Sequence, residues 1–432
     1  MITFDNIVNI VRDEFTKKAT EISAMGAIAI NRDLNGRVRL IVDERWKDDK
    51  EKQCHLNDLL GSLIPKLKPH CWSVDKSVLY EKDVQAACLG APQYNLEGFP
   101  EVFVVDRLAT ETDWASIQPA SIRSPRVVFF SIKGGVGRSS ALAASAWSLA
   151  QSGKKVLILD LDLESPGLST ALLPESKQPN FGITDWLLED LVDNGNAVIQ
   201  SMVATSDLSH DGQIYVVPAH GAEPGEYISK LSRIWMPKLK SDGTKEAWSK
   251  RLHRLIDELE TSYQPDVILI DSRAGIDEVA ASCVTELGAK LILLFAVDGN
   301  QTWNGYRILF EHWCRAGVIE TIRERFQVVS ALTPDVDTIP YIERLRDRAY
   351  NLMAETQYDD IPAGELASNA WNFEVSDETA PHNPWVVHWH RSFAGVSSLH
   401  GRILSIDSVV VQSIFGDLVN GLSNTISEEV DE

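Results

Sequence analysis

The first hundred residues alternate between helical and strand-like patterns of apolar positions. Apolar residues between positions 4 and 22 recur every three or four residues, which predicts one apolar helix face, with Asp5 as a candidate cap. Two runs of alternating polarity follow, Ala27 to Asn31 and Arg37 to Asp43. Between them, Asn35-Gly36 is expected to supply the positive φ angles of a hairpin turn.

The same region predicts one more helix and one more strand. The helix is expected over Leu56 to Leu67, and a short buried strand over Val102 to Asp106. We therefore expect a small α+β module at residues 1–118. A proline-bounded linker is expected at 119–125, before a larger domain at 126–432.

From Val127 onward, continuous apolar runs alternate with helical stretches. This pattern is typical of a mostly parallel sheet with helices on both faces, an α/β fold in which ligands lie at the carboxyl ends of the strands. The expected strands are Val127 to Phe130, Val156 to Asp160, Ile214 to Pro218, Val267 to Asp271, Leu291 to Val297, Val328 to Ala331 and Trp385 to Trp389.

A glycine-rich loop follows the first of these strands. Residues 129–140 read Phe-Phe-Ser-Ile-Lys-Gly-Gly-Val-Gly-Arg-Ser-Ser, and an alanine-rich helical run continues to Gln151. A strand, a loop rich in backbone amides and a helix N-terminus are the parts of a phosphate site. Compared with the usual G-x-x-x-x-G-K-[ST] pattern, a lysine stands early, at Lys133, and Arg138 takes the usual lysine position.

This loop resembles the deviant phosphate loop, K-G-G-x-G-[KR]-[ST], of the MinD/ParA-like P-loop ATPases. The resemblance implies ATP bound with Mg²⁺, Arg138 on the phosphates, and Lys133 reaching the nucleotide of a partner subunit in a homodimer. The residues that it implies around the phosphates are Gly134, Gly135, Val136, Gly137, Arg138, Ser139 and Ser140.

Two carboxylates follow the second strand, in Leu159-Asp160-Leu161-Asp162-Leu163-Glu164-Ser165-Pro166-Gly167. Strand alternation sends Asp160 and Asp162 to the same side. In the family that the loop resembles, this segment is switch I, and Asp162 takes the role of orienting the attacking water. Asp160 is expected to support either the magnesium shell or the loop.

A third motif ends another apolar strand, at Ile270-Asp271-Ser272-Arg273-Ala274-Gly275-Ile276. An aspartate at that position is what a Walker B element requires, so Asp271 is expected in the magnesium shell together with Ser139. Gly275 is expected to let the backbone approach the γ-phosphate. Arg273 has two interpretations, an ion pair with a neighbouring acid or a phosphate or dimer contact.

Together the three motifs are similar to the KGGVGR-motif variant of the MinD/ParA-like ATPases, over about residues 125–425. Arg138 is longer and planar compared with lysine, so slow hydrolysis is expected. The strand Val328 to Ala331 lacks the asparagine with which many relatives read adenine. ATP is the first expectation for the nucleotide and GTP the second.

Composition and charge indicate which kinds of binding partner are unfavourable for this protein. The formal net charge is −21; residues 1–120 hold 15 Lys/Arg against 19 Asp/Glu, and the rest hold 26 against 43. This disfavours nucleic acid, which needs clustered cations. The acidic end of the chain does not offer the basic amphipathic helix of a membrane anchor. Five scattered cysteines and no leader-like or 18-residue apolar run predict a cytoplasmic protein.

Three functions remain open at this point. The favoured one is an ATP-dependent switch that dimerises on nucleotide and controls an unidentified protein partner through its N-terminal module; the resemblance places some members in bacterial signalling or defence-like systems. The others are a ParA-like positioning or partition ATPase and a nucleotide-binding scaffold without hydrolysis. Zinc at Cys54-His55 with His70-Cys71, or metal at His388 and His390, fits no common ligand pattern.

Overall fold

The computed structural model describes residues 2–108, 113–361, 370–393 and 399–427. The chain divides into two compact units, Met1–Asp113 and Trp114–Glu432. No helix within the described residues is both long and apolar enough to cross a membrane. The last five residues of the acidic end discussed above, 428–432, lie outside the described residues.

The first unit is a five-stranded mixed sheet with helices. Its order is β3-β2-β1-β5-β4, in which β1 pairs antiparallel with β2 and parallel with β5. An apolar cluster joins the sheet to the helices α1 and α3. The elements are η1 (Phe4–Asn6), α1 (Ile7–Lys17), α2 (Ala19–Met25), β1 (Ile28–Arg32), β2 (Val38–Asp43), η2 (Glu44–Lys47), α3 (Lys50–Leu67), η3 (Val74–Lys76), β3 (Val78–Glu81), α4 (Val84–Cys88), β4 (Gln93–Leu96) and β5 (Phe99–Asp106).

Local details of this unit differ from the sequence expectations. The first helical turn is capped by Thr3 with Asn6, so the prediction of Asp5 as the cap is wrong. In the hairpin turn Gly36 has a positive φ and Asn35 does not. The Gly36 amide donates to the Asp33 carbonyl, which closes the turn without a special conformation at Asn35. The strands β3 and β4 were not predicted, since each is only four residues long and lies near a sheet edge.

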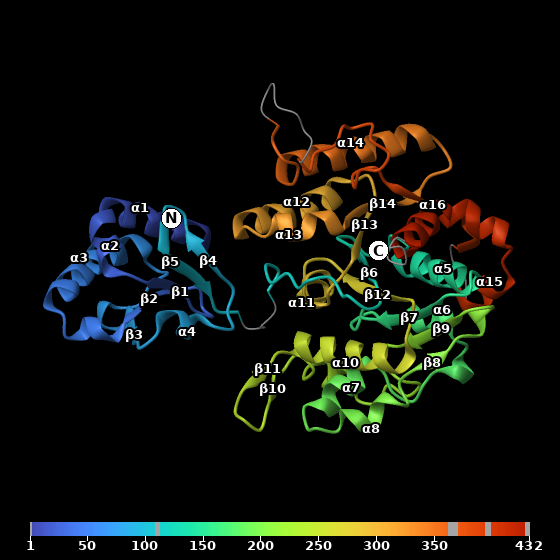
Figure 1. Ribbon diagram of the computed structural model, residues 1–432, viewed down its shortest axis with the longest axis horizontal. Coiled ribbons are helices and arrows are strands. Elements are labelled where there is room, and N and C mark those ends of the chain that lie inside the picture. Colours follow the sequence, from blue (N-terminus) through green and yellow to red (C-terminus); the bar gives the residue numbers. More distant parts are fainter. Residues whose placement is uncertain (1, 109–112, 362–369, 394–398, 428–432) are drawn as a thin grey trace. The chain divides into compact units, whose positions relative to one another are not determined.

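The second unit contains an eight-stranded sheet, whose strands from β14 to β8 are labelled in Figure 1. Its order is β15-β14-β13-β6-β12-β7-β9-β8, and every neighbouring pair is parallel except β8 with β9. All seven predicted strands are present. The strands are β6 (Arg126–Ser131), β7 (Lys155–Asp160), β8 (Ala204–Thr205), β9 (Gln213–Val217), β12 (Val267–Ala274), β13 (Leu291–Ala296), β14 (Phe326–Thr333) and β15 (Trp385–His388); a separate small hairpin joins β10 (Lys238–Leu239) and β11 (Lys245–Glu246).

Helices cover both faces of this sheet, as the continuous apolar strands predicted. On β6, Val128 and Phe130 point into the cluster with α7, α10, α12 and α14, whereas Val127 and Phe129 point into the cluster with α5, α6 and α16. The helices are α5 (Arg138–Gln151), α6 (Leu168–Leu172), η4 (Glu175–Lys177), α7 (Ile183–Asp190), α8 (Gly195–Ile199), η5 (Asp207–Ser209), α9 (Tyr227–Leu231), α10 (Trp248–Tyr263), α11 (Glu278–Ala281), the π-helix η6 (Ser282–Glu286), α12 (Asn300–Ala316), α13 (Ile319–Ile322), η7 (Arg323–Arg325), α14 (Thr338–Thr356), η8 (Arg391–Phe393), α15 (Leu399–Ser405) and α16 (Ser408–Ser427).

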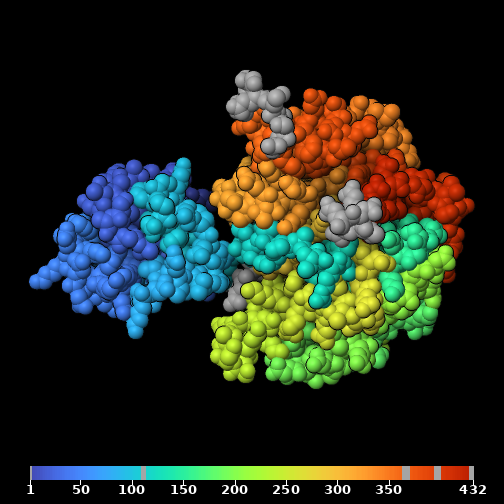
Figure 2. Space-filling view, viewed as in Figure 1, coloured from blue at the N-terminus to red at the C-terminus, as the bar shows by residue number. Residues whose placement is uncertain are grey.

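The segment before β6 packs against the second unit, so the expected boundary at 118 and the linker at 119–125 need correction. Trp114 packs beside the rings of Trp313 and Phe130, and its carbonyl accepts a hydrogen bond from Trp313. Further along, the amide of Gln118 donates to Thr285 in η6, and that of Ser121 donates to Gly288. Figure 2 shows this teal stretch on the surface between the orange and yellow regions. We name residues 114–121 the strap.

Candidate functional site

The glycine loop joins β6 to α5 at the carboxyl edge of the sheet. Gly135 and Gly137 have φ of +74° and +78°, a conformation that side chains rarely adopt. Within the described residues, the backbone amides of residues 134–140 have no hydrogen-bond acceptor. The loop therefore presents a run of free N–H groups next to the N-terminus of a 14-residue helix, which favours an anion.

Arg138 lies deeper than expected. Its side chain is only 7% exposed, and its guanidinium donates to three groups: Asp271 at 2.8 Å, the Ser131 hydroxyl at 2.8 Å and Asp162 at 3.3 Å. The sequence interpretation placed this charge on the phosphates. In the structure it instead joins the Walker B strand to the switch I segment, because two acidic side chains converge on it at the sheet edge.

Ser139 and Asp271, the two residues expected in the magnesium shell, contact one another. The Ser139 hydroxyl donates to one oxygen of Asp271 at 2.5 Å, and Arg138 occupies the other oxygen. Asp271 lies at the end of β12, between β6 and β7, so the parallel register brings it beside both the loop and Asp160. A hydroxyl and a carboxylate held together are oxygen ligands of the kind that Mg²⁺ prefers.

The two aspartates after β7 differ in environment. Asp160 is fully buried and accepts hydrogen bonds from the amides of Asp162, Gly167 and Leu168, so it braces the switch I segment. This favours the loop role over the magnesium role. Burial, followed by the nearby charge of Asp271, raises the pKa of Asp160 to about 7.

Asp162 lies nearer the surface. Burial raises its pKa, and the Arg138 guanidinium opposes that rise. One oxygen contacts Arg138, and the other is enclosed without a hydrogen-bond partner among the described residues. An enclosed carboxylate oxygen that still needs a donor fits the predicted role of holding a water molecule.

The remaining predicted residues lie around this centre. Lys133 is exposed and makes no ion pair within the described parts of the chain. The Gly275 amide, expected to face the γ-phosphate, donates to the Ser131 carbonyl at 2.9 Å. Arg273 pairs with Glu164 at 2.6 Å and Asp277 at 3.1 Å, which supports the ion-pair interpretation.

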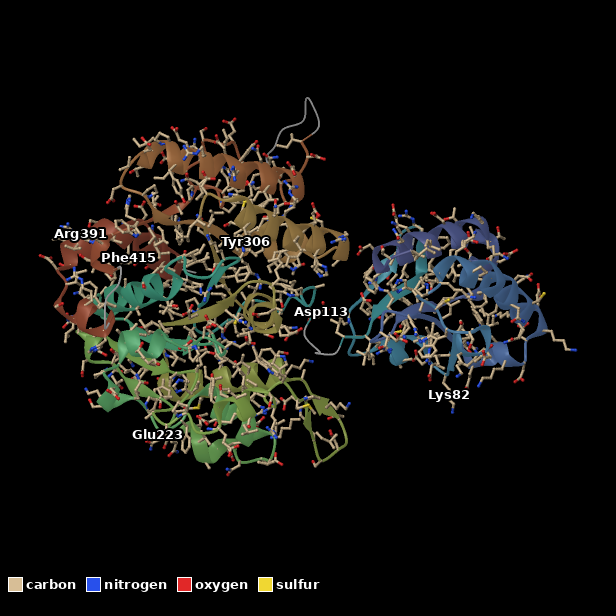
Figure 3. The ribbon with its side chains drawn as sticks, turned by 180° about the vertical axis from the view of Figure 1, so that it is seen from behind. Lys82, Asp113, Glu223, Tyr306, Arg391 and Phe415 are labelled. Atoms are coloured by element: carbon tan, nitrogen blue, oxygen red, sulfur yellow. The ribbon has the colours of Figure 1, made fainter. Side chains whose placement is uncertain are left out.

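A cavity of about 200 Å³ adjoins the loop on the side of β14 and β15. Loop residues Gly135, Gly137 and Ser140 form one wall, and α16 contributes another through Phe415, labelled in Figure 3. The rest of the lining includes Leu332, Val387, His388, Trp389, His390, Phe393 and Ile414. A mostly apolar cavity with imidazole and indole edges suits a flat aromatic ring.

Sequence reasoning missed Ser131 and Tyr227. Ser131 is fully buried and bonds to Arg138, and it was overlooked because a serine at the end of a strand carries no distinctive signal. The Tyr227 hydroxyl donates to the carbonyl of Leu163 in switch I from a helix 64 residues away.

A phosphate loop between a parallel strand and a helix, with a serine and a Walker B aspartate in contact, defines the class of P-loop nucleoside triphosphatases. Residues 124–202 match a family model described as "ParA: NUBPL iron-transfer P-loop NTPase". Over these residues the chain is similar to the ParA group of P-loop NTPases.

Among curated proteins, the cytosolic Fe-S cluster assembly factor CFD1 of Eremothecium gossypii is 31% identical over 120 residues. This match covers 27% of the chain and 43% of the relative, so the chain spans less than half of that protein's length.

Two solved structures are also similar. The ParA protein of pNOB8 has a TM-score of 0.43 and 16% identity, covering 71% of this chain and 99% of its own. MinD of Pyrococcus horikoshii, complexed with Mg-ADP, has a TM-score of 0.40 and 18% identity, covering 72% and 96%. At TM-scores below 0.5, neither structure carries weight for the mechanism.

The residues present fit a magnesium nucleotide. The free amides of the loop would surround its phosphates, Ser139 and Asp271 would hold the metal, and the apolar cavity would take the base. When bound, the metal would supply charge neutralisation between phosphate oxygens.

Proposed function

We propose that this protein is an ATP-binding switch with slow, magnesium-dependent hydrolysis, which dimerises on nucleotide and controls a protein partner through its first unit. The observation that carries the proposal is the arrangement at the carboxyl edge of the sheet. There the free amides of the glycine loop adjoin a Ser139–Asp271 pair and the enclosed carboxylate of Asp162.

Nucleotide binding rests on charge and on free donors. The loop offers amides, the α5 N-terminus and the exposed cation Lys133, all favourable for phosphate oxygens. The aromatic side chains of Trp389 and His390 in the cavity lining suit either purine base. ATP is proposed ahead of GTP because it is the first expectation from the sequence.

Hydrolysis needs a positioned water and neutralised charge, and no covalent intermediate. Asp162 is the residue proposed to orient the water, and Arg138 and Lys133 are proposed to neutralise the phosphates. Arg138 must leave Asp271 and Asp162 to do so. Because a buried, paired guanidinium resists that move, turnover is expected to be slow.

Dimerisation follows from Lys133. It is an exposed cation in the loop, and in the family that the motif resembles this lysine serves the nucleotide of the opposite subunit. Asp271 and Arg138 are buried, whereas Lys133 is exposed, which supports the proposed contact with a second subunit.

The strap offers a route from the site to the first unit. Asp271 and Arg273 are followed directly by α11 and η6, and Thr285 of η6 accepts the hydrogen bond from Gln118. Movement of the segment after Asp271 would therefore pull on the strap, which continues into the first unit. The partner of that unit is unidentified, and a role in bacterial signalling or defence belongs to the proposal.

Light scattering with ATP and Mg²⁺, alongside turnover measurements, tests the proposal. The parent protein should bind ATP, form a dimer and release phosphate slowly, while Lys133→Ala should bind ATP without dimerising. Lys155→Ala, an exposed lysine at the first position of β7, is the matched control and should behave as the parent. A protein that binds ATP yet stays monomeric at all concentrations would contradict the dimer; binding without any turnover would favour the scaffold function.

A further inference from the structure

Ser131 makes three hydrogen bonds that converge on the nucleotide site. Its hydroxyl accepts from the Arg138 guanidinium at 2.8 Å and donates to the carbonyl of Lys133 at 3.0 Å. Its own carbonyl accepts from the Gly275 amide at 2.9 Å. One fully buried residue thereby contacts the loop, the arginine of the loop and the segment after the Walker B aspartate.

The hydroxyl also completes the set of partners around Arg138. Nε and the two terminal nitrogens of the guanidinium each have one acceptor: Asp271, Ser131 and Asp162 respectively. Two of these acceptors are the carboxylates proposed for magnesium and water. A guanidinium held on them opposes a second cation at the same place and is turned away from phosphate.

We propose that Ser131 is a positioning residue that anchors Arg138 on Asp271 and Asp162, so that the entry of phosphate requires Arg138 to leave this anchor. When Arg138 moves to the phosphates, both carboxylates become available. Binding of the nucleotide and release of the carboxylates are then one event. This inference rests on the proposed nucleotide binding.

The sign of one measurement separates this role from a merely structural one. Ser131→Ala removes one hydrogen bond to a charged group from the anchored arrangement of Arg138 only, so ATP should bind roughly tenfold more tightly. If the hydroxyl served only to shape the loop through the Lys133 carbonyl, its loss would weaken ATP binding.

The experiment is calorimetric titration of ATP with Mg²⁺ into the full-length parent, Ser131→Ala and Ser131→Thr, after thermal unfolding has shown that each is folded. Ser131→Thr keeps the hydroxyl and should bind ATP as the parent does. If Ser131→Ala does not fold, Asp162→Asn supplies the second route, because it weakens the same anchor from the other side and should also tighten binding.

Unchanged or weaker binding in the folded Ser131→Ala variant would overturn the inference, as would equal tightening in Ser131→Thr. Should Ser131→Ala be unfolded, unchanged or weaker binding by Asp162→Asn would overturn it. These results require that the parent binds ATP. A parent that does not bind ATP contradicts the proposed function itself, so the two failures are distinguishable.

Discussion

The two units each place charged side chains at one end of a sheet, yet only one of these ends has the features of a reaction centre. In the first unit, a cavity of about 640 Å³ is lined by three aspartates and three cations, among them Lys82, labelled in Figure 3. Its aspartates, Asp43, Asp49 and Asp83, are partly or fully exposed. Each caps the turn or helix that follows it, because its carboxylate accepts hydrogen bonds from backbone amides there.

In the second unit the cavity beside the loop is smaller, but the charges are buried. Asp160, Asp271 and Arg138 lie at the carboxyl edge of a nearly all-parallel sheet; Arg138 pairs with Asp271, and Asp160 accepts hydrogen bonds from the switch I backbone. Burying charge costs free energy unless each group is paired, so such an arrangement points to chemistry more strongly than cavity size does.

The largest expected effect comes from breaking the buried pair. Asp271→Asn leaves the buried Arg138 without its main counter-ion, so we expect a loss of about 3–5 kcal/mol in the free energy of unfolding. ATP turnover should fall at least about 100-fold, since the metal shell loses a charge. Urea unfolding and phosphate release measure the two effects.

The matched control lies in the first unit. Asp83→Asn keeps a capping oxygen on an exposed site, so stability should change by less than about 0.5 kcal/mol. Equal effects of the two substitutions would remove the distinction between the units.

The second prediction concerns pH. The folded-state pKa of Asp160, about 7, lies above its ordinary value near 4, so the folded protein holds this proton more tightly than the unfolded chain. Its contribution to stability, roughly 4 kcal/mol, is full below pH 4 and is lost as pH rises to 7.

Asp160→Asn should flatten this part of the curve of unfolding free energy against pH, because an amide does not titrate there. Asp43→Asn in the first unit should leave the fall between pH 4 and 7 in place, since hydrogen bonds from Arg45 lower the pKa of Asp43 to about 2. A parent curve without that fall, or one that Asp160→Asn does not flatten, would contradict the assignment.

The third prediction concerns the boundary between the units. A fragment of residues 114–432 should unfold cooperatively and bind ATP, whereas residues 122–432 should be less stable by about 2–4 kcal/mol, because Trp114 and two backbone hydrogen bonds of the strap are lost. Equal stability of the two fragments in urea would show that the strap does not belong to the second unit.

The smallest effect is expected at Arg273. The side chains of Arg273, Glu164 and Asp277 are 31%, 44% and 24% exposed, so these ion pairs are screened by solvent. Arg273→Gln should therefore cost no more than about 1 kcal/mol of unfolding free energy. Thermal unfolding at low and high salt measures it. A loss as large as that of Asp271→Asn would contradict the contrast between buried and exposed charge.

Much of the difference between the buried charges of the second unit and the exposed charges of the first could be predicted from the sequence. Long apolar runs determine the strands of the second unit, and the parallel order brings Asp160 and Asp271 together, so the paired residues at the sheet edge were expected. Where Arg138 points was not predictable, because it depends on Ser131 and Asp162, which lie at or just after the ends of two different strands and meet the guanidinium only in the folded sheet. The strap was missed for a similar reason: Trp114 and Gln118 contact residues more than 160 positions away.

The central claim is that the carboxyl edge of the second unit binds a magnesium nucleotide. Titration of ATP with Mg²⁺ into the full-length protein, followed by calorimetry, tests it most directly. We predict saturable binding of one ATP per chain, weakened at least tenfold by Gly135→Val, whose side chain does not fit a φ of +74°, and unaffected by Gly90→Val in the first unit. A folded parent that shows no saturable heat with ATP or GTP would contradict the account.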